Sequence, residues 1–382
     1  MALTDVYISP SGAGDNSGSS VANALPAISS GDWSTTIEAL DRANKRFIWL
    51  EGTYNCTTTL TFSGSVPSKS QPHQWVGAKS DGTILRPKFN ESGNALDISN
   101  YPVIIQSNND RICHVEEETS YKCISFQNSS ASYTQTGIVD NTSGDMDLQT
   151  FEGCHFKAAP NGSSAIIIEA LRNRFYMCEM HADSTTYNCV VQLWNPCSVD
   201  SCVIHGGGTS VTSGACNGVE TYAGNVGLKN CLIYDVGGNG FANIATNARN
   251  AGVNHVNNTY INCGGDGIDT STMSSADTST NSSIIGGCII FGCGAYGINT
   301  GADDTRMMGT QYIAMGSNTS GNFNNLDSYE DMIDTITITT ADFVDYANKD
   351  FRIKRTSSLY KIFGNANMGG LQNEDYEFTS VS

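Results

Sequence analysis

The stretch Cys231-Leu-Ile-Tyr-Asp-Val-Gly-Gly-Asn-Gly-Phe241 joins a short apolar strand to a glycine-rich corner, and Phe241 opens the next strand. The same pattern returns in Asn262-Cys-Gly-Gly-Asp-Gly-Ile268 and in Phe291-Gly-Cys-Gly-Ala-Tyr-Gly-Ile298. Glycine permits the positive φ angles of a tight corner. Because glycine at this density would cost about 1 kcal/mol at each helical site, the pattern predicts short strands and tight turns rather than helices.

An internal repeat extends outward from that stretch along the middle of the chain. It consists of triplets whose first and third residues are small or apolar and would share one face of a strand. The triplets are Ile124-Ser-Phe126, Cys154-His-Phe156, Cys178-Glu-Met180, Cys202-Val-Ile204, Cys231-Leu-Ile233, Thr259-Tyr-Ile261 and Cys288-Ile-Ile290. Their first residues are separated by 30, 24, 24, 29, 28 and 29 positions. A repeat of this length predicts a solenoid that completes one coil per repeat.

Cysteine opens five of these triplets, which predicts a stacked column of buried thiols. The chain contains 13 cysteines and no CxxC pair. Since their spacing follows the coil, we interpret them as reduced, small apolar core residues rather than as disulfides or metal ligands.

The repeat and the corners predict an all-β protein, a right-handed parallel β-helix with an N-terminal helix cap. Residues 1–55 would form a strand and an amphipathic capping helix over 34–44, because the open end of a solenoid needs a polar cover. Residues 56–340 would form the β-helix itself. Residues 341–382 would form a closing coil and a tail.

Several runs resemble the pectate-lyase-like β-helix superfamily. Tyr7-Ile-Ser-Pro-Ser-Gly12, Asn16-Ser-Gly-Ser-Ser20 and Gly52-Thr-Tyr54 resemble its opening segment, and three runs near the end resemble its closing coil: Asp342-Phe-Val-Asp345, Asp350-Phe-Arg-Ile353 and Thr356-Ser-Ser-Leu359. The resemblance implies the fold but no single activity, because the superfamily contains lyases, hydrolases, epimerases, adhesins and phage spikes.

The charge balance is acidic, with 20 Lys and Arg against 38 Asp and Glu, a net charge of -18. Such a field repels phosphate backbones and anionic lipids, so nucleic acid and membranes are not expected as partners. We find no signal peptide and no apolar run near the roughly 18 residues of a membrane span, and we therefore expect synthesis in a cytoplasm.

A polysaccharide lyase of this superfamily would need stacked carboxylates for Ca²⁺. The best candidate is Gly264-Gly-Asp-Gly-Ile-Asp269. The repeat places Asn239 and Tyr296 on either side of Asp266, so no column of carboxylates is predicted. We interpret Asp266 as a loop residue that binds its own backbone.

A polygalacturonase-like hydrolase would carry paired Asp, then Gly-His-Gly, then Arg-Ile-Lys, in that order. Asp303-Asp304 and Arg352-Ile-Lys354 are present, but His205-Gly-Gly-Gly208 precedes both. We therefore do not predict this site, and we assign Arg352-Ile-Lys354 to the closing coil. A sugar-stacking strip of Tyr187, Trp194 and Tyr222 stays open as an alternative.

The histidines show no metal-binding spacing such as HxxxH. They are His73, His114, His155, His181, His205 and His255. Because His155 is the middle residue of its triplet, we expect it to face outward into solvent.

No catalytic, cofactor-binding or metal-binding residue is predicted, and no cofactor is expected. The leading hypothesis is a structural protein of a bacteriophage virion, either a capsid decoration or a tail spike or fibre component. It would be made in the host cytoplasm, form a homotrimer and contact other virion proteins such as the capsid or tail, with a surface polysaccharide as a further possible ligand. The alternative is a polysaccharide lyase or hydrolase (a depolymerase) or a carbohydrate-binding β-helix, so whether the protein is an enzyme stays open.

Overall fold

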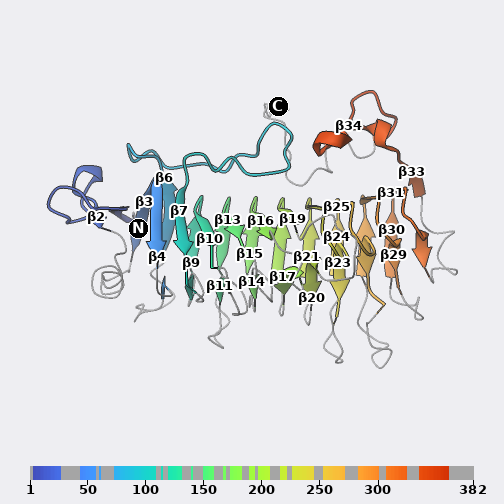
Figure 1. Cartoon of the computed structure of the whole chain (residues 1–382), viewed down its shortest axis with the longest axis horizontal. Coiled ribbons are helices and arrows are strands. Elements are labelled where there is room, and N and C mark those ends of the chain that lie inside the picture. The colour runs from blue at the N-terminus through green and yellow to red at the C-terminus, as the bar shows by residue number, and fades with distance from the viewer. Residues whose placement is uncertain are drawn as a thin grey trace, which may run out of the picture.

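The computed structural model describes residues 3–26, 44–56, 60–61, 73–108, 113–114, 119–130, 139–140, 149–158, 167–168, 173–182, 189–193, 197–206, 216–221, 226–244, 253–271, 283–300, 307–324 and 335–360. Within them, the chain winds through three long parallel sheets of 12, 11 and 10 strands, which we name sheets A, B and C. Each strand pairs with the strand one coil earlier and one coil later, so the coils stack along one axis (Figure 1). This arrangement confirms the predicted parallel β-helix.

Sheet A contains β1 (Thr4–Ser9), β2 (Leu25–Pro26), β3 (Lys45–Leu50), β6 (His73–Ala78), β9 (Thr119–Lys122), β12 (Thr150–Glu152), β15 (Arg174–Tyr176), β18 (Cys197–Asp200), β21 (Val226–Lys229), β24 (Val253–Val256), β27 (Ser283–Gly286) and β30 (Met307–Gln311). Sheet B contains β4 (Gly52–Cys56), β7 (Pro102–Gln106), β10 (Ser125–Asn128), β13 (His155–Lys157), β16 (Glu179–Ala182), β19 (Val203–Gly206), β22 (Leu232–Tyr234), β25 (Thr259–Ile261), β28 (Ile289–Phe291), β31 (Ile313–Gly316) and β33 (Thr335–Thr337). Sheet C contains β5 (Leu60–Thr61), β8 (Cys113–His114), β11 (Val139–Asp140), β14 (Ile167–Ile168), β17 (Cys189–Leu193), β20 (Asn217–Thr221), β23 (Phe241–Asn243), β26 (Ile268–Asp269), β29 (Tyr296–Asn299) and β32 (Gly321–Asn324).

The corner from sheet A to sheet B is the same in successive coils. One residue there adopts a left-handed conformation with φ between 50° and 65°, in the positions Cys123, Gly153, Met177, Ser201, Asn230, Asn257, Gly287 and Tyr312. The next residue points into the core, and the strand of sheet B follows. This corner sets the inward register of the cysteine column.

The predicted cysteine column is confirmed, because Cys154, Cys178, Cys202, Cys231 and Cys288 are all fully buried. The alignment of the triplet at Thr259 is wrong by one residue. Thr259 pairs with Leu232, so Asn258 occupies the column position between Cys231 and Cys288.

Asn258 is a polar residue in an otherwise apolar column, and its amide is fully paired there. Its Oδ1 accepts from the backbone N of Cys231 at 2.9 Å, and its Nδ2 donates to the carbonyl of Leu228 at 3.0 Å. A buried amide is tolerated when both of its ends are hydrogen-bonded. In this coil the side chain that points into the core next is that of Tyr260, which is fully buried. The sequence alignment had placed Tyr260 in the middle of the triplet, where it would face outward.

Aromatic side chains stack from coil to coil in the N-terminal half of the core. Phe47 stacks on Trp75 with ring centroids 4.2 Å apart, and Phe151 stacks on Tyr121 and Phe175 at 4.9 and 5.2 Å. The same inward column continues with Val199, Leu228, His255 and Ile285. Aromatic stacking therefore gives way to aliphatic packing toward the C-terminus.

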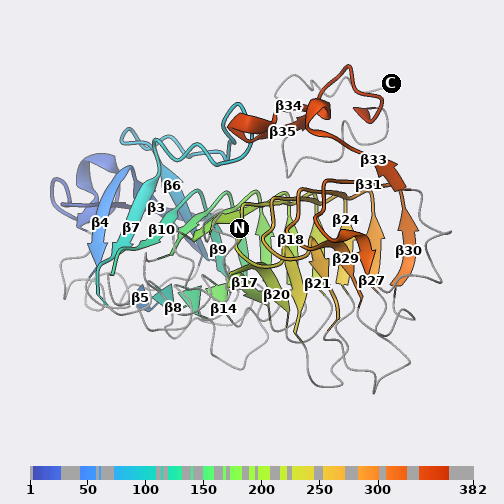
Figure 2. The ribbon, with the colours of Figure 1, turned by 45° about the vertical axis from the view of Figure 1, so that its right-hand side comes forward.

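Two segments leave the coils and lie over the outer face of sheet B (Figure 2). The first, residues 79–101, follows β6 and is named here the N-terminal cover. The second, residues 339–360, is named the C-terminal cover and contains the 3₁₀ turns η5 (Thr340–Asp342) and η6 (Tyr346–Asn348) and the antiparallel strands β34 (Phe343–Asp345) and β35 (Asp350–Ile353). The described part of the predicted closing coil, residues 341–360, thus folds back along the solenoid.

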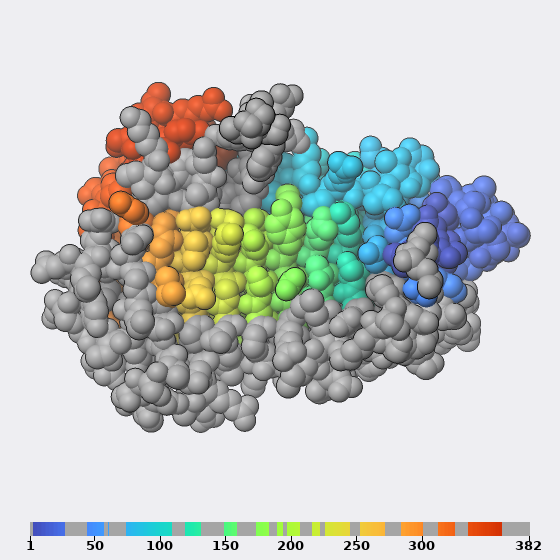
Figure 3. All heavy atoms as spheres, turned by 180° about the vertical axis from the view of Figure 1, so that it is seen from behind, coloured from blue at the N-terminus to red at the C-terminus, as the bar shows by residue number. Residues whose placement is uncertain are grey.

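The C-terminal cover packs on sheet B through a second apolar core. Phe343, Phe351, Ile353 and Leu359 contact outward-facing residues of β19 to β31 in this core, among them Leu232 and Ile289. Seen from behind, the two covers lie along the same edge of the stacked coils (Figure 3).

The predicted capping helix over 34–44 lies almost entirely outside the described residues and stays a prediction. At the N-terminal end, the described residues include the short 3₁₀ turn η1 (Val21–Asn23) beside β1. In the described part of the chain, no helix is long and apolar enough to cross a membrane.

Candidate functional site

On the outer face of sheet B, titratable side chains from neighbouring coils gather in one group. Two outward columns are set by the strand register. One column runs Ser125, His155, Glu179, Val203 and Leu232, and the other runs Gln127, Lys157, His181, His205 and Tyr234. Strands in register one coil apart place these side chains about 4.8 Å from their neighbours.

Glu179 and His205 form the central pair of this group. The Nε2 of His205 lies 2.9 Å from Oε1 of Glu179, and the two side chains are only 14% and 7% exposed. A carboxylate only accepts, so Nε2 carries the hydrogen and donates it. The second carboxylate oxygen, Oε2, accepts from the backbone N of Leu96 in the N-terminal cover at 2.6 Å.

These contacts keep Glu179 ionised although it is buried. Burial alone opposes ionisation, but the hydrogen bond from His205, the charges of His205 and His155 and the Leu96 N–H outweigh it, so the pKa of Glu179 is lowered. The site therefore holds a desolvated negative charge beside an imidazole at neutral pH.

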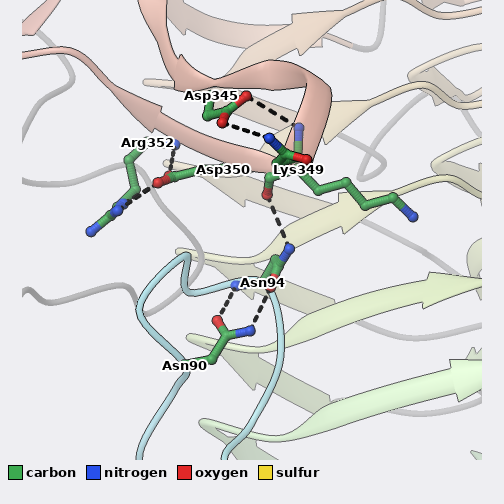
Figure 4. Close-up of polar contacts among 7 residues, drawn as sticks. Asn90, Asn94, Asp345, Lys349, Asp350 and Arg352 are labelled. Atoms are coloured by element: carbon green, nitrogen blue, oxygen red, sulfur yellow. Dashed lines mark hydrogen bonds and ion pairs between the residues drawn. The ribbon is translucent and has the colours of Figure 1, made fainter.

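A ladder of stacked rings fixes the orientation of His205. His181 stacks on one side at 4.3 Å between centroids, and Tyr234 stacks on the other at 4.8 Å. Lys349 of the C-terminal cover lies 5.7 Å from the centroid of Tyr234 and is paired with Asp235 at 2.7 Å. The two covers meet beside this ladder, where Asn94 donates to the carbonyl of Lys349 at 3.1 Å (Figure 4).

Glu179, His181 and His205 each offer one ligand atom, and these atoms lie within 4.8 Å of one another. Sequence reasoning missed this group because it searched for ligand spacing within one helix or loop. The signal was the 24-residue step from Cys178 to Cys202, which equals the step from His181 to His205 and so places the two histidines in one column.

The expectation that His155 is solvated is wrong. It faces away from the coil as predicted, but it is only 5% exposed, and its Nδ1 lies 2.8 Å from Oγ of Ser125. The N-terminal cover removes this part of the outer face from water, as the bond from Leu96 to the adjacent Glu179 illustrates. Since Ser125 is fully buried, the Ser125–His155 bond is a structural contact.

Asp269 lies on β26 of sheet C and Asp266 lies in the corner just before it, away from this group. The predicted neighbours are confirmed, because Asp266 N donates to Asn239 Oδ1 and Tyr296 N donates to Asp266 Oδ1, both at 2.7 Å. Asp266 thus binds the backbone of the next coil rather than its own. Burial raises its pKa. These contacts join successive coils, and their oxygens are already hydrogen-bonded.

Of the remaining candidate residues, the structure describes the side chains of Arg352 and Lys354 but not those of the others. Arg352 pairs with Asp350 at 2.8 and 2.5 Å, and Lys354 donates to the carbonyl of Ala341 at 2.9 Å, so this motif holds the C-terminal cover together. The others lie outside the described residues or have undescribed side chains: His73, His114, Tyr187, Trp194, Tyr222, Asp303 and Asp304.

Comparison with solved structures gives a match over nearly the whole chain. The crystal structure of pectate lyase Pel9A aligns with a TM-score of 0.51 and 14% sequence identity, covering 98% of this chain and 93% of that one. The chain has a pectate-lyase-like parallel β-helix fold. At this identity the likeness of the pectate-lyase-like chain to Pel9A concerns the fold alone.

No family model matches the sequence, and no curated protein matches it. The function of this pectate-lyase-like β-helix therefore has to be argued from its own residues.

Proposed function

We propose that this chain is a structural protein of a bacteriophage virion, a capsid decoration or tail component built as a stiff rod. The observation that carries the proposal is the pair of covers, which connect coils far apart in the solenoid. In a solenoid each coil contacts only its neighbours, so bending and fraying are opposed only locally. Contacts that bypass intervening coils add stiffness along the axis.

The N-terminal cover makes such long-range contacts. It leaves the chain after β6, and its Leu96 binds Glu179 on β16 while the carbonyl of Asn94 accepts from the Tyr234 hydroxyl on β22 at 3.1 Å. The C-terminal cover continues the line, because Tyr346 donates to Asn262 and Lys349 pairs with Asp235. Together they brace the outer face of sheet B from β16 to β31.

This construction suits a load-bearing component more than an open binding groove, because the chain itself covers much of sheet B. The acidic net charge of -18 adds solubility at high copy number. By analogy with other β-helix rods we further propose a homotrimer attached to capsid or tail proteins.

The test is mass spectrometry of purified particles together with light scattering of the isolated protein. We expect the chain in particles at a fixed copy ratio and a trimeric mass in solution. Absence from every particle fraction would contradict the virion role, and a monomeric mass would contradict the trimer.

A second candidate is a protein that binds or cleaves an acidic polysaccharide. The ionised, desolvated Glu179 beside His205 is an acid–base pair, and the chain shares the fold of a pectate lyase. The assay is formation of unsaturated uronates or new reducing ends on a panel of pectate, alginate and capsular glycans. Turnover that disappears in both Glu179→Gln and His205→Asn, but persists in Asp266→Asn, would favour this candidate over the structural one.

A further inference from the structure

We propose that Glu179, His181 and His205 bind one Zn²⁺ ion on the outer face of sheet B. The proposal rests on where their ligand atoms lie and does not depend on the function proposed above. The three atoms, one carboxylate oxygen and two imidazole nitrogens, lie within 4.8 Å of one another at the point where the two covers meet.

The donor set selects the metal. Two imidazoles and one carboxylate are a common protein ligand set for zinc, with the remaining position taken by water. Ca²⁺ and Mg²⁺ prefer six or more oxygen ligands and would be poorly served here. Zinc with an open position is therefore the ion that this group fits.

The ligand atoms are close enough, but one of the two stacked imidazoles must turn out of the stack, because ring-plane lone pairs of nearly parallel rings do not meet at one point. Ligands about 2.1 Å from a tetrahedral ion lie about 3.4 Å apart, between the 2.9 Å from Glu179 to His205 and the 4.8 Å limit of the group. Without the ion, Nε2 of His205 donates its hydrogen to Glu179, so binding through Nε2 requires the other neutral tautomer, in which the hydrogen sits on Nδ1 and the Nε2 lone pair is free for the ion.

Neighbouring groups already orient two of the ligands. The N–H of Leu96 holds Oε2 of Glu179 and leaves Oε1 facing His205. The ring of Tyr234 stacks on the His205 imidazole on the side away from His181. Such outer contacts raise metal affinity because less freedom is lost on binding.

The charged groups around the ligands are mostly positive, so the attraction for a cation comes from the Glu179 carboxylate itself. His155 and Lys157 lie on β13, one coil before Glu179, and Lys349 lies beyond Tyr234 with its charge paired to Asp235.

The test uses the full-length protein after dialysis against a chelator. Equilibrium dialysis with Zn²⁺, followed by metal analysis, should give one ion per chain, undisturbed by excess Ca²⁺. His181→Asn and Glu179→Gln should weaken binding at least about tenfold. The matched control, His155→Asn, keeps a partner for Ser125 outside the ligand set and should bind as the wild type does. Circular dichroism establishes that each variant is folded.

Co²⁺ provides a readout on the wild type alone. Four-coordinate Co²⁺ on nitrogen and oxygen ligands should give visible d–d bands without the near-ultraviolet charge-transfer band of a thiolate. No binding by the wild type, equal loss in His155→Asn, or a thiolate band pointing to the cysteines would each overturn the proposal.

Discussion

Asn94 and Lys349 are 255 positions apart in the sequence, yet the side-chain amide of one donates to the backbone carbonyl of the other at 3.1 Å. Beside this bond, the Asn90 side-chain amide donates to Asn94 Oδ1 and accepts from the backbone N of Asn94, and Asp345 caps the turn η6, which is followed by Lys349 (Figure 4). The bond joins the N-terminal cover to the C-terminal cover, so it closes the outer face of sheet B at its middle.

Replacing Asn94 with alanine should loosen both covers without unfolding the coils. Loss of one hydrogen bond of this kind costs about 1 kcal/mol, and the bond to Asn90 is lost as well. We expect faster hydrogen exchange in residues 84–101 and 343–353, with β21 to β28 unchanged.

Asn100→Ala is the matched control for that experiment, because Asn100 donates only to the adjacent Ser99. Equal exchange in the two variants would show that the bond to Lys349 does not hold the covers together.

The cysteines should resist alkylation in the native protein. The described thiols are all buried, and burial raises the pKa of Cys56, Cys123 and Cys288 to about 12. Because the thiolate is the reactive form, iodoacetamide at neutral pH should modify these positions only after unfolding in urea. Peptide mass spectrometry measures each site, and rapid native labelling of Cys178, Cys202 or Cys231 would contradict the inward register.

Asn258 should tolerate cysteine better than leucine. Either change removes the donor for Leu228 O, and leucine also removes the acceptor for Cys231 N; each unpaired buried group costs about 1–3 kcal/mol. A cysteine sulfur can still accept, as Cys202 Sγ does from Cys178 N at 3.4 Å. Urea unfolding should therefore rank wild type above Asn258→Cys and Asn258→Leu last. A leucine variant as stable as the wild type would show that the amide is not needed.

Acid should destabilise the fold through His255. This imidazole is fully buried, its Nδ1 lies 2.8 Å from the Tyr260 hydroxyl, and burial lowers its pKa to about 3. The unfolded chain takes up a proton near the ordinary pKa of about 6.5, whereas the folded chain does not until about pH 3. The stability that neutral His255 contributes to the folded state is therefore fully present above about pH 6.5. Below that, it falls by about 1.4 kcal/mol for each pH unit.

The measurement is urea unfolding at about pH 7 and about pH 5, where this term removes roughly 2 kcal/mol from the wild type. Over the same pH change, the free energy of unfolding of the double variant His255→Leu, Tyr260→Phe should fall by less than that of the wild type, and the difference should equal this term. Tyr260→Phe alone serves as the control. An unchanged pH dependence in the double variant would assign the acid sensitivity to other groups, such as the buried Glu179.

The repeat in the sequence was sufficient to predict the parallel β-helix, the buried cysteines and the stacking of Asn239, Asp266 and Tyr296. These features depend on the register between adjacent coils, and that register follows from the roughly constant number of residues in each coil. The predicted alignment is wrong by one residue at Thr259, because Asn258 breaks the apolar pattern. An amide is tolerated at that buried position only because both of its ends are hydrogen-bonded.

The sequence by itself determined the coil, since alternation along each strand and glycine at the corners act between neighbouring residues and coils. The tertiary structure alone decided which outward faces are covered. His155 is outward in the repeat and yet buried, and Glu179, His181 and His205 gather beside Leu96 and Asn94 from a segment that leaves the coil far earlier. The path of a cover depends on apolar and polar contacts between residues more than 80 positions apart. Such contacts leave no periodic pattern in the sequence from which they could be predicted.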